Sequence, residues 1–214
     1  MVKIMIVEDH PLFSKGLSSL LGSREGYTVV GEAKDSKEAL ELAAEKKPDL
    51  VILDLNLGNE DGLDLLKVMH RRFPKIAVLV LSMHDERYYA ERVLKAGGRG
   101  YIMKTEAGNK VIEASETVLA GETYFSEAQR ERLSGCPEGG GKRPLVSVEK
   151  LSDRQFQIFN LLGKGLGTLE IAVKLNLSAK TIDTHKEHIK DKLRCGTTQE
   201  LKQLAIEWVS RPAG

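Results

Sequence analysis

Five short apolar runs alternate with segments of helical spacing over about the first 120 residues, and this alternation constrains the fold more than any other feature. The runs are KIMIV, TVVGEA, LVILDL, IAVLVLS and GRGYIM, at 3–7, 28–33, 50–55, 76–82 and 98–103. Helical periodicity lies between them, at 12–21, 36–46, 62–72, 86–96 and 107–119. Such alternation predicts an α/β fold: a doubly wound, five-stranded parallel sheet with helices on both faces.

The alternation stops after Tyr124, and a different pattern follows. The stretch SGCPEGGGKRP at 134–144 is too rich in Gly and Pro to pack as an element, so it predicts a linker. Four short helical patterns without strands come next, near 152–162, 168–175, 179–193 and 198–209. We therefore expect three parts: an α/β domain at 1–125, a linker at 126–147 and a small all-helical domain at 148–211.

Charge divides the chain in the same way. Residues 1–125 carry 17 Lys and Arg against 20 Asp and Glu, whereas residues 148–214 carry 11 against 8. The two halves are therefore expected to bind different partners. No apolar run approaches the roughly 20 residues that span a bilayer, and the N-terminus lacks the zones of a signal peptide, so we expect a cytoplasmic protein. Cys136 and Cys195 lie far apart and suggest neither a disulfide framework nor a zinc site.

Reactive side chains follow four of the predicted strands. Glu8 and Asp9 follow the first, and Asp54, Ser82 and Lys104 end or follow the third, fourth and fifth. The carboxyl ends of parallel strands open on one edge of a sheet, so these groups should meet there. Three carboxylates in one place repel one another, and Mg²⁺ is the usual cation that relieves this repulsion. Asp54 is then free to attack phosphorus, while Lys104 neutralises phosphoryl oxygens and Ser82 offers a hydroxyl.

The first half resembles the receiver domain of two-component response regulators. The resemblance rests on IMIVEDHPLFSKGL, PDLVILDLNLGNEDGLDLL, VLVLS and AGGRGYIMK, which cover most of residues 1–120. It implies that Asp54 is the phosphoryl acceptor, that Ser82 and Lys104 contact the phosphoryl group, and that Ser82 and Tyr101 form the switch. It further implies a Mg²⁺ site made by Glu8, Asp9, Asp54 and the backbone carbonyl of Asn56. Two features stay open: Tyr101 also fits a half-buried core residue, and Gly58 replaces the usual proline.

The second half has the element lengths of a helix-turn-helix. The stretch LNLSAKT at 175–181 supplies the short turn, with Ser178 as the N-cap of the helix that follows. On that helix, Ile182, Ile189 and Leu193 form the apolar stripe that should be buried. Its other positions carry mostly polar and charged side chains.

This half resembles the LuxR-type DNA-binding domain of the NarL/FixJ class of response regulators. The resemblance rests on LSDRQFQIFNLLGKG, EIAVKLNLSAKTIDTH and IKDKL, within about residues 148–210. It implies that the helix at 179–193 reads the DNA major groove and that the last helix mediates dimerisation. The DNA-contacting residues would be Lys180, Thr181, Asp183, Thr184, Lys186, Glu187, His188 and Lys190, with Lys192 as a further phosphate anchor. The dimerisation residues would be Leu201, Leu204, Ala205 and Trp208, although a stripe of this spacing also fits domain core.

Together these features predict a transcription regulator controlled by phosphorylation. A histidine kinase would phosphorylate Asp54 in a Mg²⁺-dependent step, and the switched receiver would control dimerisation and double-stranded DNA binding, with no turnover beyond slow self-dephosphorylation. Two alternatives remain. A metal-dependent phosphohydrolase also uses an aspartate nucleophile beside Mg²⁺, and an adaptor would bind a protein partner regardless of phosphorylation and leave DNA untouched.

Overall fold

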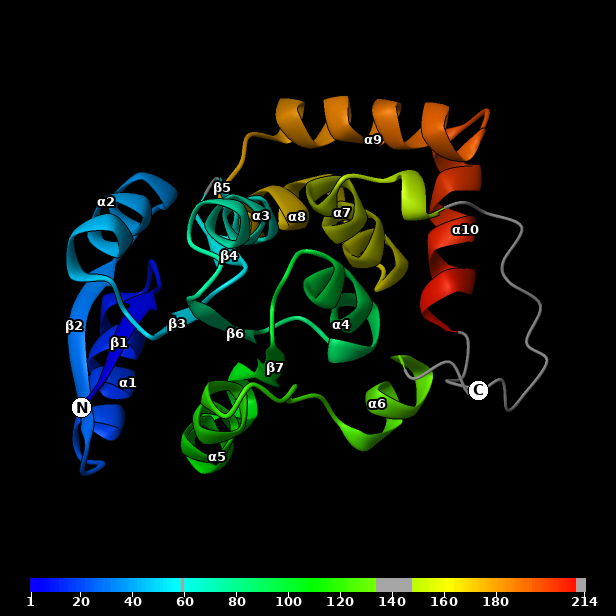
Figure 1. The fold of residues 1–214 in the computed structure, drawn as a ribbon. Helices are drawn as coiled ribbons and strands as arrows, with labels where there is room; N and C mark the ends of the chain where they lie inside the picture. The colour runs from blue at the N-terminus through cyan, green and yellow to red at the C-terminus, as the bar shows by residue number, and fades with distance from the viewer. Residues whose placement is uncertain (59, 134–147, 211–214) are drawn as a thin grey trace. The chain divides into compact units, whose positions relative to one another are not determined.

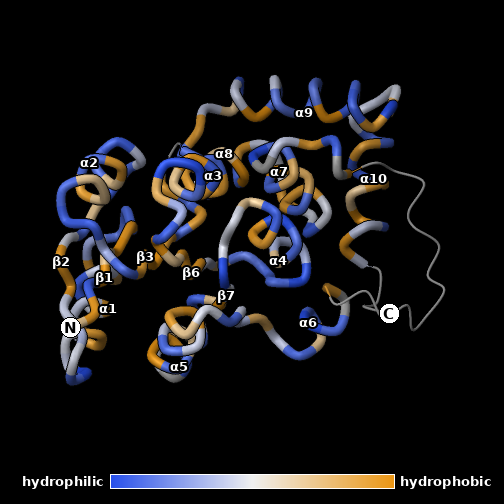
Figure 2. Tube along the Cα trace, viewed as in Figure 1, coloured by the Kyte–Doolittle hydropathy of each residue, from blue (hydrophilic) through white to orange (hydrophobic). Residues whose placement is uncertain are grey.

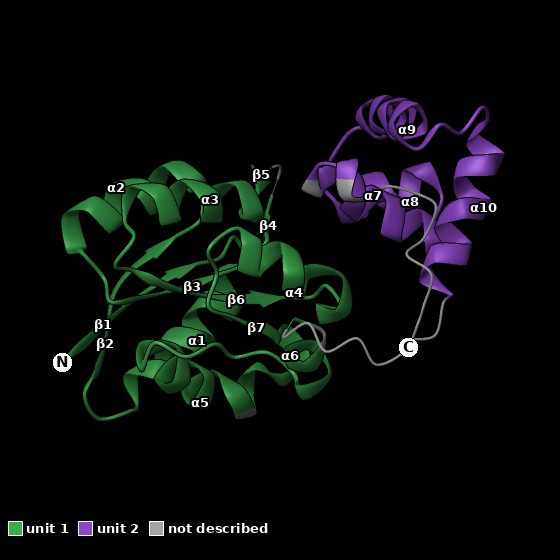
Figure 3. Ribbon diagram, turned by 45° about the vertical axis from the view of Figure 1, so that its right-hand side comes forward, with its two compact units in different colours: residues 1–136 green, residues 137–214 purple. Residues whose placement is uncertain are grey.

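The computed structural model describes residues 1–58, 60–133 and 148–210. It divides into two compact units, residues 1–136 and 137–214 (Figure 3). Among the described residues, no helix is long and apolar enough to cross a membrane.

The first unit is built on the predicted five-stranded parallel sheet. Its strands are β1 (Val2–Val7), β2 (Tyr27–Ala33), β3 (Leu50–Leu53), β6 (Ala77–Ser82) and β7 (Gly100–Met103). They pair in the order β2-β1-β3-β6-β7, and every pairing is parallel. The fold class expected from the sequence is therefore confirmed.

Helices cover both faces of this sheet. They are α1 (Pro11–Gly22), α2 (Ser36–Lys46), α3 (Gly62–Arg72), α4 (Glu86–Lys95) and α5 (Ala107–Leu119). Figures 1 and 3 show α1 and α5 on one face and α2, α3 and α4 on the other. Leu17 and Leu21 of α1 and Val111 of α5 join one buried cluster with strand residues such as Ile4 and Ile52, which fixes these helices on the sheet.

Aspartates are the N-cap residues of three helices, and each cap fixes the residue at which the preceding loop ends. Asp35, Asp61 and Asp85 each accept a hydrogen bond from a backbone N–H in the first turn of α2, α3 and α4. The spacing of Asp35 and Glu38 predicts the first of these caps. In the structure the Glu38 carboxylate accepts from the Lys34 N–H at 3.0 Å, one residue before the cap.

Five short elements have no counterpart in the sequence prediction: two strands, one helix and the 3₁₀ turns Lys104–Glu106 and Val148–Lys150. The hairpin of β4 (Asn56–Leu57) and β5 (Glu60–Asp61) follows β3, and helix α6 (Glu127–Leu133) lies within the segment expected to be a linker. Before α6, Tyr124 extends the sheet: its carbonyl accepts from the Tyr101 N–H at 2.8 Å, beside edge strand β7. Residues 134–147, the rest of the expected linker, lie outside the described residues.

The second unit is all-helical in its described part. Its elements are the 3₁₀ turn Val148–Lys150 and helices α7 (Asp153–Gly163), α8 (Thr168–Lys174), α9 (Ala179–Leu193) and α10 (Thr198–Val209). Ser152, Ser178 and Thr197 cap α7, α9 and α10, and Ser152 forms a reciprocal capping box with Gln155. Figure 2 shows hydrophobic and hydrophilic residues alternating along α7 and α9, as amphipathic packing requires.

Candidate functional site

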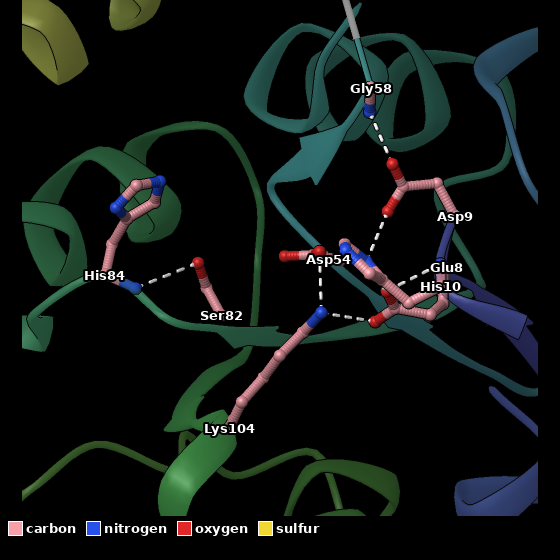
Figure 4. Close-up of polar contacts among 8 residues, drawn as sticks. All are labelled: Glu8, Asp9, His10, Asp54, Gly58, Ser82, His84 and Lys104. Carbon is pink, nitrogen blue, oxygen red and sulfur yellow. Dashed lines mark hydrogen bonds and ion pairs between the residues drawn. The ribbon is translucent and has the colours of Figure 1, made fainter. Parts of the chain in front are cut away.

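The carboxyl edge of the sheet brings together the side chains that the sequence selects. Glu8 and Asp9 follow β1, Asp54 follows β3, Ser82 ends β6 and Lys104 follows β7 (Figure 4). Glu8, Asp54 and Ser82 are buried, with exposed fractions of 5%, 3% and 0%. Parallel strands end at one edge of the sheet. Residues that are up to 96 positions apart in the sequence therefore meet in a single pocket.

Lys104 is the cation at the centre of this pocket. Its Nζ lies 2.8 Å from Asp54 Oδ2 and 2.5 Å from Glu8 Oε2, and its side chain is only 7% exposed. The Phe13 ring covers the same ammonium, at 4.7 Å from the ring centre. One positive charge therefore bridges two buried carboxylates.

Burial dominates the protonation of Asp54. Removal from water raises the pKa of Asp54 to about 6; Lys104 opposes this rise and Glu8 adds to it. Burial by itself lowers the pKa of Lys104, but its contacts with Asp54 and Glu8 outweigh burial and raise the pKa. At neutral pH this leaves Asp54 mostly ionised and Lys104 charged, which is the state that a carboxylate nucleophile needs.

Asp9 and His10 form the outer part of the pocket. Asp9 Oδ2 accepts from the Gly58 N–H at 2.8 Å, whereas Asp9 Oδ1 is buried and has no hydrogen-bond partner. His10 Nδ1 lies 2.8 Å from Glu8 Oε1 and 2.8 Å from Asp9 Oδ1. The hydrogen bond to Glu8, followed by the charges of Asp9 and Glu8, raises the pKa of His10 against the lowering effect of burial.

The donor set of this pocket fits a divalent cation. Ligand atoms of Glu8, Asp9, His10 and Asp54 all lie within 4.8 Å of one another. Carboxylate oxygens are the ligands that Mg²⁺ prefers, and Asp9 Oδ1, whose neighbour is His10 Nδ1 at 2.8 Å, accepts no hydrogen bond that a cation would have to replace. Asn56, the remaining predicted ligand, begins β4, and its backbone N–H donates to the Asp54 carboxylate.

The two predicted switch residues meet at His84. Ser82 Oγ accepts from the His84 N–H at 3.3 Å, and Tyr101 Oη donates to the His84 carbonyl at 2.8 Å (Figure 4 for Ser82). The His84 ring stacks on Tyr89 of α4 at 4.9 Å. Tyr101 is 2% exposed, and burial raises its pKa well above the usual value. Its hydroxyl is therefore a hydrogen-bond donor at any physiological pH.

The predicted reading helix α9 presents only some of its candidate residues to solvent. Lys180, Asp183, Thr184, Glu187 and His188 are exposed, Thr181 and Lys190 are half-buried, and Lys186 is buried.

The α9 lysines are also paired inside the unit. Lys186 Nζ contacts Thr168 Oγ1 of α8 and lies 3.4 Å from Asp183, and Lys190 lies 2.8 Å from Glu187. Lys192 donates to Gln155 of α7 at 2.7 Å. Lys180 and Lys192 are exposed and form no ion pair among the described residues, and Lys180 also makes no side-chain hydrogen bond there.

Comparison with known families identifies both units. Residues 4–116 match the response regulator receiver domain, and residues 149–205 match the LuxR family of bacterial regulatory proteins. The chain is 35% identical over 212 residues to the oxygen regulatory protein NreC of Staphylococcus epidermidis, covering 96% of this chain and 97% of NreC. It is 36% identical over 204 residues to the transcriptional activator ExaE of Pseudomonas putida, covering 95% of each.

The chain is a two-component response regulator. It carries a LuxR-type DNA-binding domain and acts as a transcription regulator, and members of this family are non-enzymatic transcription factors. This family assignment favours the transcription regulator over the phosphohydrolase and adaptor alternatives. Among solved structures, the response regulator is similar to RcsB of Salmonella enterica serovar Typhimurium bound to the rprA promoter with BeF₃⁻. The TM-score is 0.60, with 26% identity over 96% of this chain and 98% of that one. It is also similar to an RcsB–DNA complex, with a TM-score of 0.57, 25% identity and coverage of 98% and 99%.

The last helix of this response regulator divides its apolar stripe between the domain core and the surface. Leu201 and Ala205 are fully buried, whereas Leu204 and Trp208 are half-buried. The Ala205 carbonyl lies 2.3 Å from where a Cβ on Gly163 would be, so α7 and α10 approach too closely for any larger residue there. Two of the four stripe residues, Leu201 and Ala205, therefore pack in the domain core, and Leu204 and Trp208 are the two that remain partly exposed.

The sequence analysis did not select His10 and noted Gly58 only as the replacement of a proline, although both contact the predicted metal ligands. His10 directly follows the acidic pair, and this adjacency was the signal that could have selected it. The Gly58 contact depends on the path of the β4–β5 hairpin, which leaves no such signal in the sequence.

Proposed function

We propose that Asp54 is the phosphoryl acceptor of this response regulator and that a histidine kinase, in the cytoplasm, is the donor. The observation that carries the proposal is the Asp54 carboxylate at the end of β3, 3% exposed and 2.8 Å from Lys104 Nζ. One Asp54 oxygen forms a bond to phosphorus while the bond from phosphorus to the donor imidazole breaks. Lys104 then faces the added negative charge.

Glu8, Asp9 and Asp54, with the Asn56 carbonyl, would hold the Mg²⁺ ion. When bound, Mg²⁺ neutralises charge on the phosphoryl oxygens. Asp9 keeps one oxygen without a hydrogen bond, and Gly58 fixes the other at 2.8 Å, so the carboxylate is oriented before the cation arrives. Because the Asp9 carboxylate is already oriented, metal binding requires less reorganisation of this side chain.

The His84 contacts support Ser82 and Tyr101 as the switch. Ser82 accepts from the His84 backbone N–H and Tyr101 donates to the His84 carbonyl, so a shift of Ser82 toward a phosphoryl oxygen would break the first bond and release the backbone to which Tyr101 is bonded. His84 also stacks on α4, and the Glu86 carboxylate of α4 accepts from the Ser126 N–H at 2.8 Å, just before α6. A change at Asp54 therefore has a contiguous path to the end of the receiver.

The DNA-binding role of α9 and a phosphorylation-dependent homodimer complete the proposal. The predicted contacts are Lys180, Thr181, Asp183, Thr184, Lys186, Glu187, His188 and Lys190, and the predicted dimer contacts are Leu201, Leu204, Ala205 and Trp208. RcsB, a similar protein, has been solved in complex with DNA and as two dimers on two parallel DNAs. Asp183 and Glu187 repel phosphates but accept hydrogen bonds from cytosine, so they would favour selectivity over affinity.

Intact mass tests the acceptor. Full-length wild type, incubated with Mg²⁺ and a small acyl phosphate, should gain about 80 Da, the mass of one phosphoryl group. Asp54→Asn, and wild type in EDTA, should gain nothing. Sizing chromatography and DNA titration on the same samples should show a shift to dimer and tighter binding in the modified wild type alone. A gain of the same mass in Asp54→Asn would place the acceptor elsewhere.

A further inference from the structure

His10 places a nitrogen among the oxygens of the acidic pocket. Its Nδ1 lies between two carboxylate oxygens, 2.8 Å from Glu8 Oε1 and 2.8 Å from Asp9 Oδ1. The Nδ1 atom belongs to the four-residue ligand set whose atoms lie within 4.8 Å of one another. Opposite ligands on one octahedral cation lie roughly 4 Å apart, so a small contraction lets all four groups reach a single ion.

The local backbone holds this imidazole over the pocket. His10 is the residue before α1, with an extended conformation (φ −96°, ψ 104°), and Pro11 after it disfavours a helical alternative. The His10 N–H also donates to Glu8 Oε1 at 3.1 Å. The ring itself is exposed, with a side-chain exposure of 65%, so it can rotate onto a cation without disturbing the core.

The other polar contacts leave the His10 side as the approach for a cation, which must replace the proton and the 2.8 Å bond that join His10 Nδ1 to Glu8 Oε1. Lys104 occupies Glu8 Oε2 and Asp54 Oδ2, and the Gly58 N–H occupies Asp9 Oδ2. Asp9 Oδ1 accepts no hydrogen bond, and its contact is with His10 Nδ1 at 2.8 Å, an ion pair when the imidazole is protonated. A cation bound by Asp9 Oδ1 would therefore lie within reach of the imidazole.

Nitrogen changes which cations such a site prefers. Carboxylate oxygen suits Mg²⁺, whereas imidazole is a strong ligand for Co²⁺, Ni²⁺, Cu²⁺ and Zn²⁺. We propose that His10 Nδ1 is a direct ligand of the divalent cation in this pocket and makes it selective for first-row transition dications over Mg²⁺. This inference rests on the proposed cation site of Glu8, Asp9 and Asp54. Since both kinds of ion use these carboxylates, they compete for one site.

Calorimetric titration of the full-length protein with Co²⁺ and with Mg²⁺ tests the proposal. Replacing an outer-shell partner of a metal ligand already weakens binding 10- to 100-fold. His10→Gln should therefore weaken Co²⁺ binding at least about tenfold and change Mg²⁺ binding less than about twofold. His70→Gln is the matched control, because His70 is an exposed histidine on α3 outside the ligand set, and it should change neither affinity.

Imidazole signals of the Co²⁺-loaded protein give a readout independent of affinity. One paramagnetically shifted histidine resonance should appear in wild type and in His70→Gln and be missing in His10→Gln. Equal effects of His10→Gln on both cations, or no effect on either, would overturn the role of His10. Failure of wild type to bind Mg²⁺, or Mg²⁺ binding that persists undiminished in Asp9→Asn, would instead overturn the proposed cation site.

Discussion

Replacing Asp54 with asparagine should stabilise the receiver domain at neutral pH. Burial raises the pKa of Asp54 to about 6, against about 3.9 in an unfolded chain. Between these values the folded protein binds the proton and the unfolded chain does not, so the free energy of unfolding falls as pH rises through this window. A difference of about two pKa units corresponds to at most about 3 kcal/mol at pH 7.5.

Asparagine removes this cost because it keeps the shape of the side chain without its charge. Its amide oxygen can still accept from Lys104, which retains its contact with Glu8. For a domain of this size, about 3 kcal/mol raises Tm by roughly 10 °C. At pH 5 the gain should fall to about half, because the wild-type carboxylate is then mostly protonated in the folded state.

Differential scanning calorimetry of the full-length proteins in EDTA measures this effect. The LuxR-type domain lacks the pocket, so its transition serves as an internal control. Asp64→Asn is the matched variant, because its carboxylate is 74% exposed in the side chain and should shift Tm by the equivalent of less than about 0.5 kcal/mol. An Asp54→Asn protein with the wild-type Tm at pH 7.5, or with the same gain at both pH values, would refute the reasoning.

Two further predictions concern packing and DNA. Gly62→Ala should lower the receiver Tm by the equivalent of about 1–3 kcal/mol, because its Cβ would lie 2.4 Å from the Asp54 carbonyl. A Cβ at Gly16 in α1 would have nothing within 4 Å, so Gly16→Ala should raise the free energy of unfolding by up to about 1 kcal/mol. Equal changes in Tm for Gly62→Ala and Gly16→Ala in calorimetry would contradict this packing argument. In DNA titrations, Lys180→Met should reduce the magnitude of the slope of log K against log[salt] by about one. The ammonium of Lys186, although Lys186 is among the proposed DNA contacts, is paired internally, so Lys186→Met should leave this slope unchanged and thereby remove Lys186 from that set. A reduced slope for Lys186→Met would show that its pairing breaks on DNA.

The composition of the pocket follows from the sequence because two general rules apply to it. Apolar runs of strand length separated by helical segments predict a parallel sheet, and parallel strands end at one edge. These rules place Glu8, Asp9, Asp54, Ser82 and Lys104 together without knowledge of any distance. The helix bounds also follow closely, because the caps at Asp35 and Ser178 are local in sequence.

The sequence does not predict the β4–β5 hairpin or helix α6. Each strand of the hairpin has two residues, too few for any period to show. Helix α6 has seven residues and follows Tyr124, whose pairing with β7 depends on which strand lies at the sheet edge. Strand order is a property of the whole domain and leaves no local pattern.

The sequence by itself determined the succession of the five sheet strands and of the longer helices along the chain, the set of reacting groups and the family, because periodicity, caps and motifs are encoded within short stretches. Tertiary structure alone decided how those groups are paired. His10 faces Asp9, Gly58 fixes the other Asp9 oxygen, and Lys186 of the reading helix is held by Thr168, 18 residues away. The Gly58 and Lys186 contacts join parts of the chain that are distant in sequence, and the pairing of a charge depends on which neighbour the packing brings within hydrogen-bond distance.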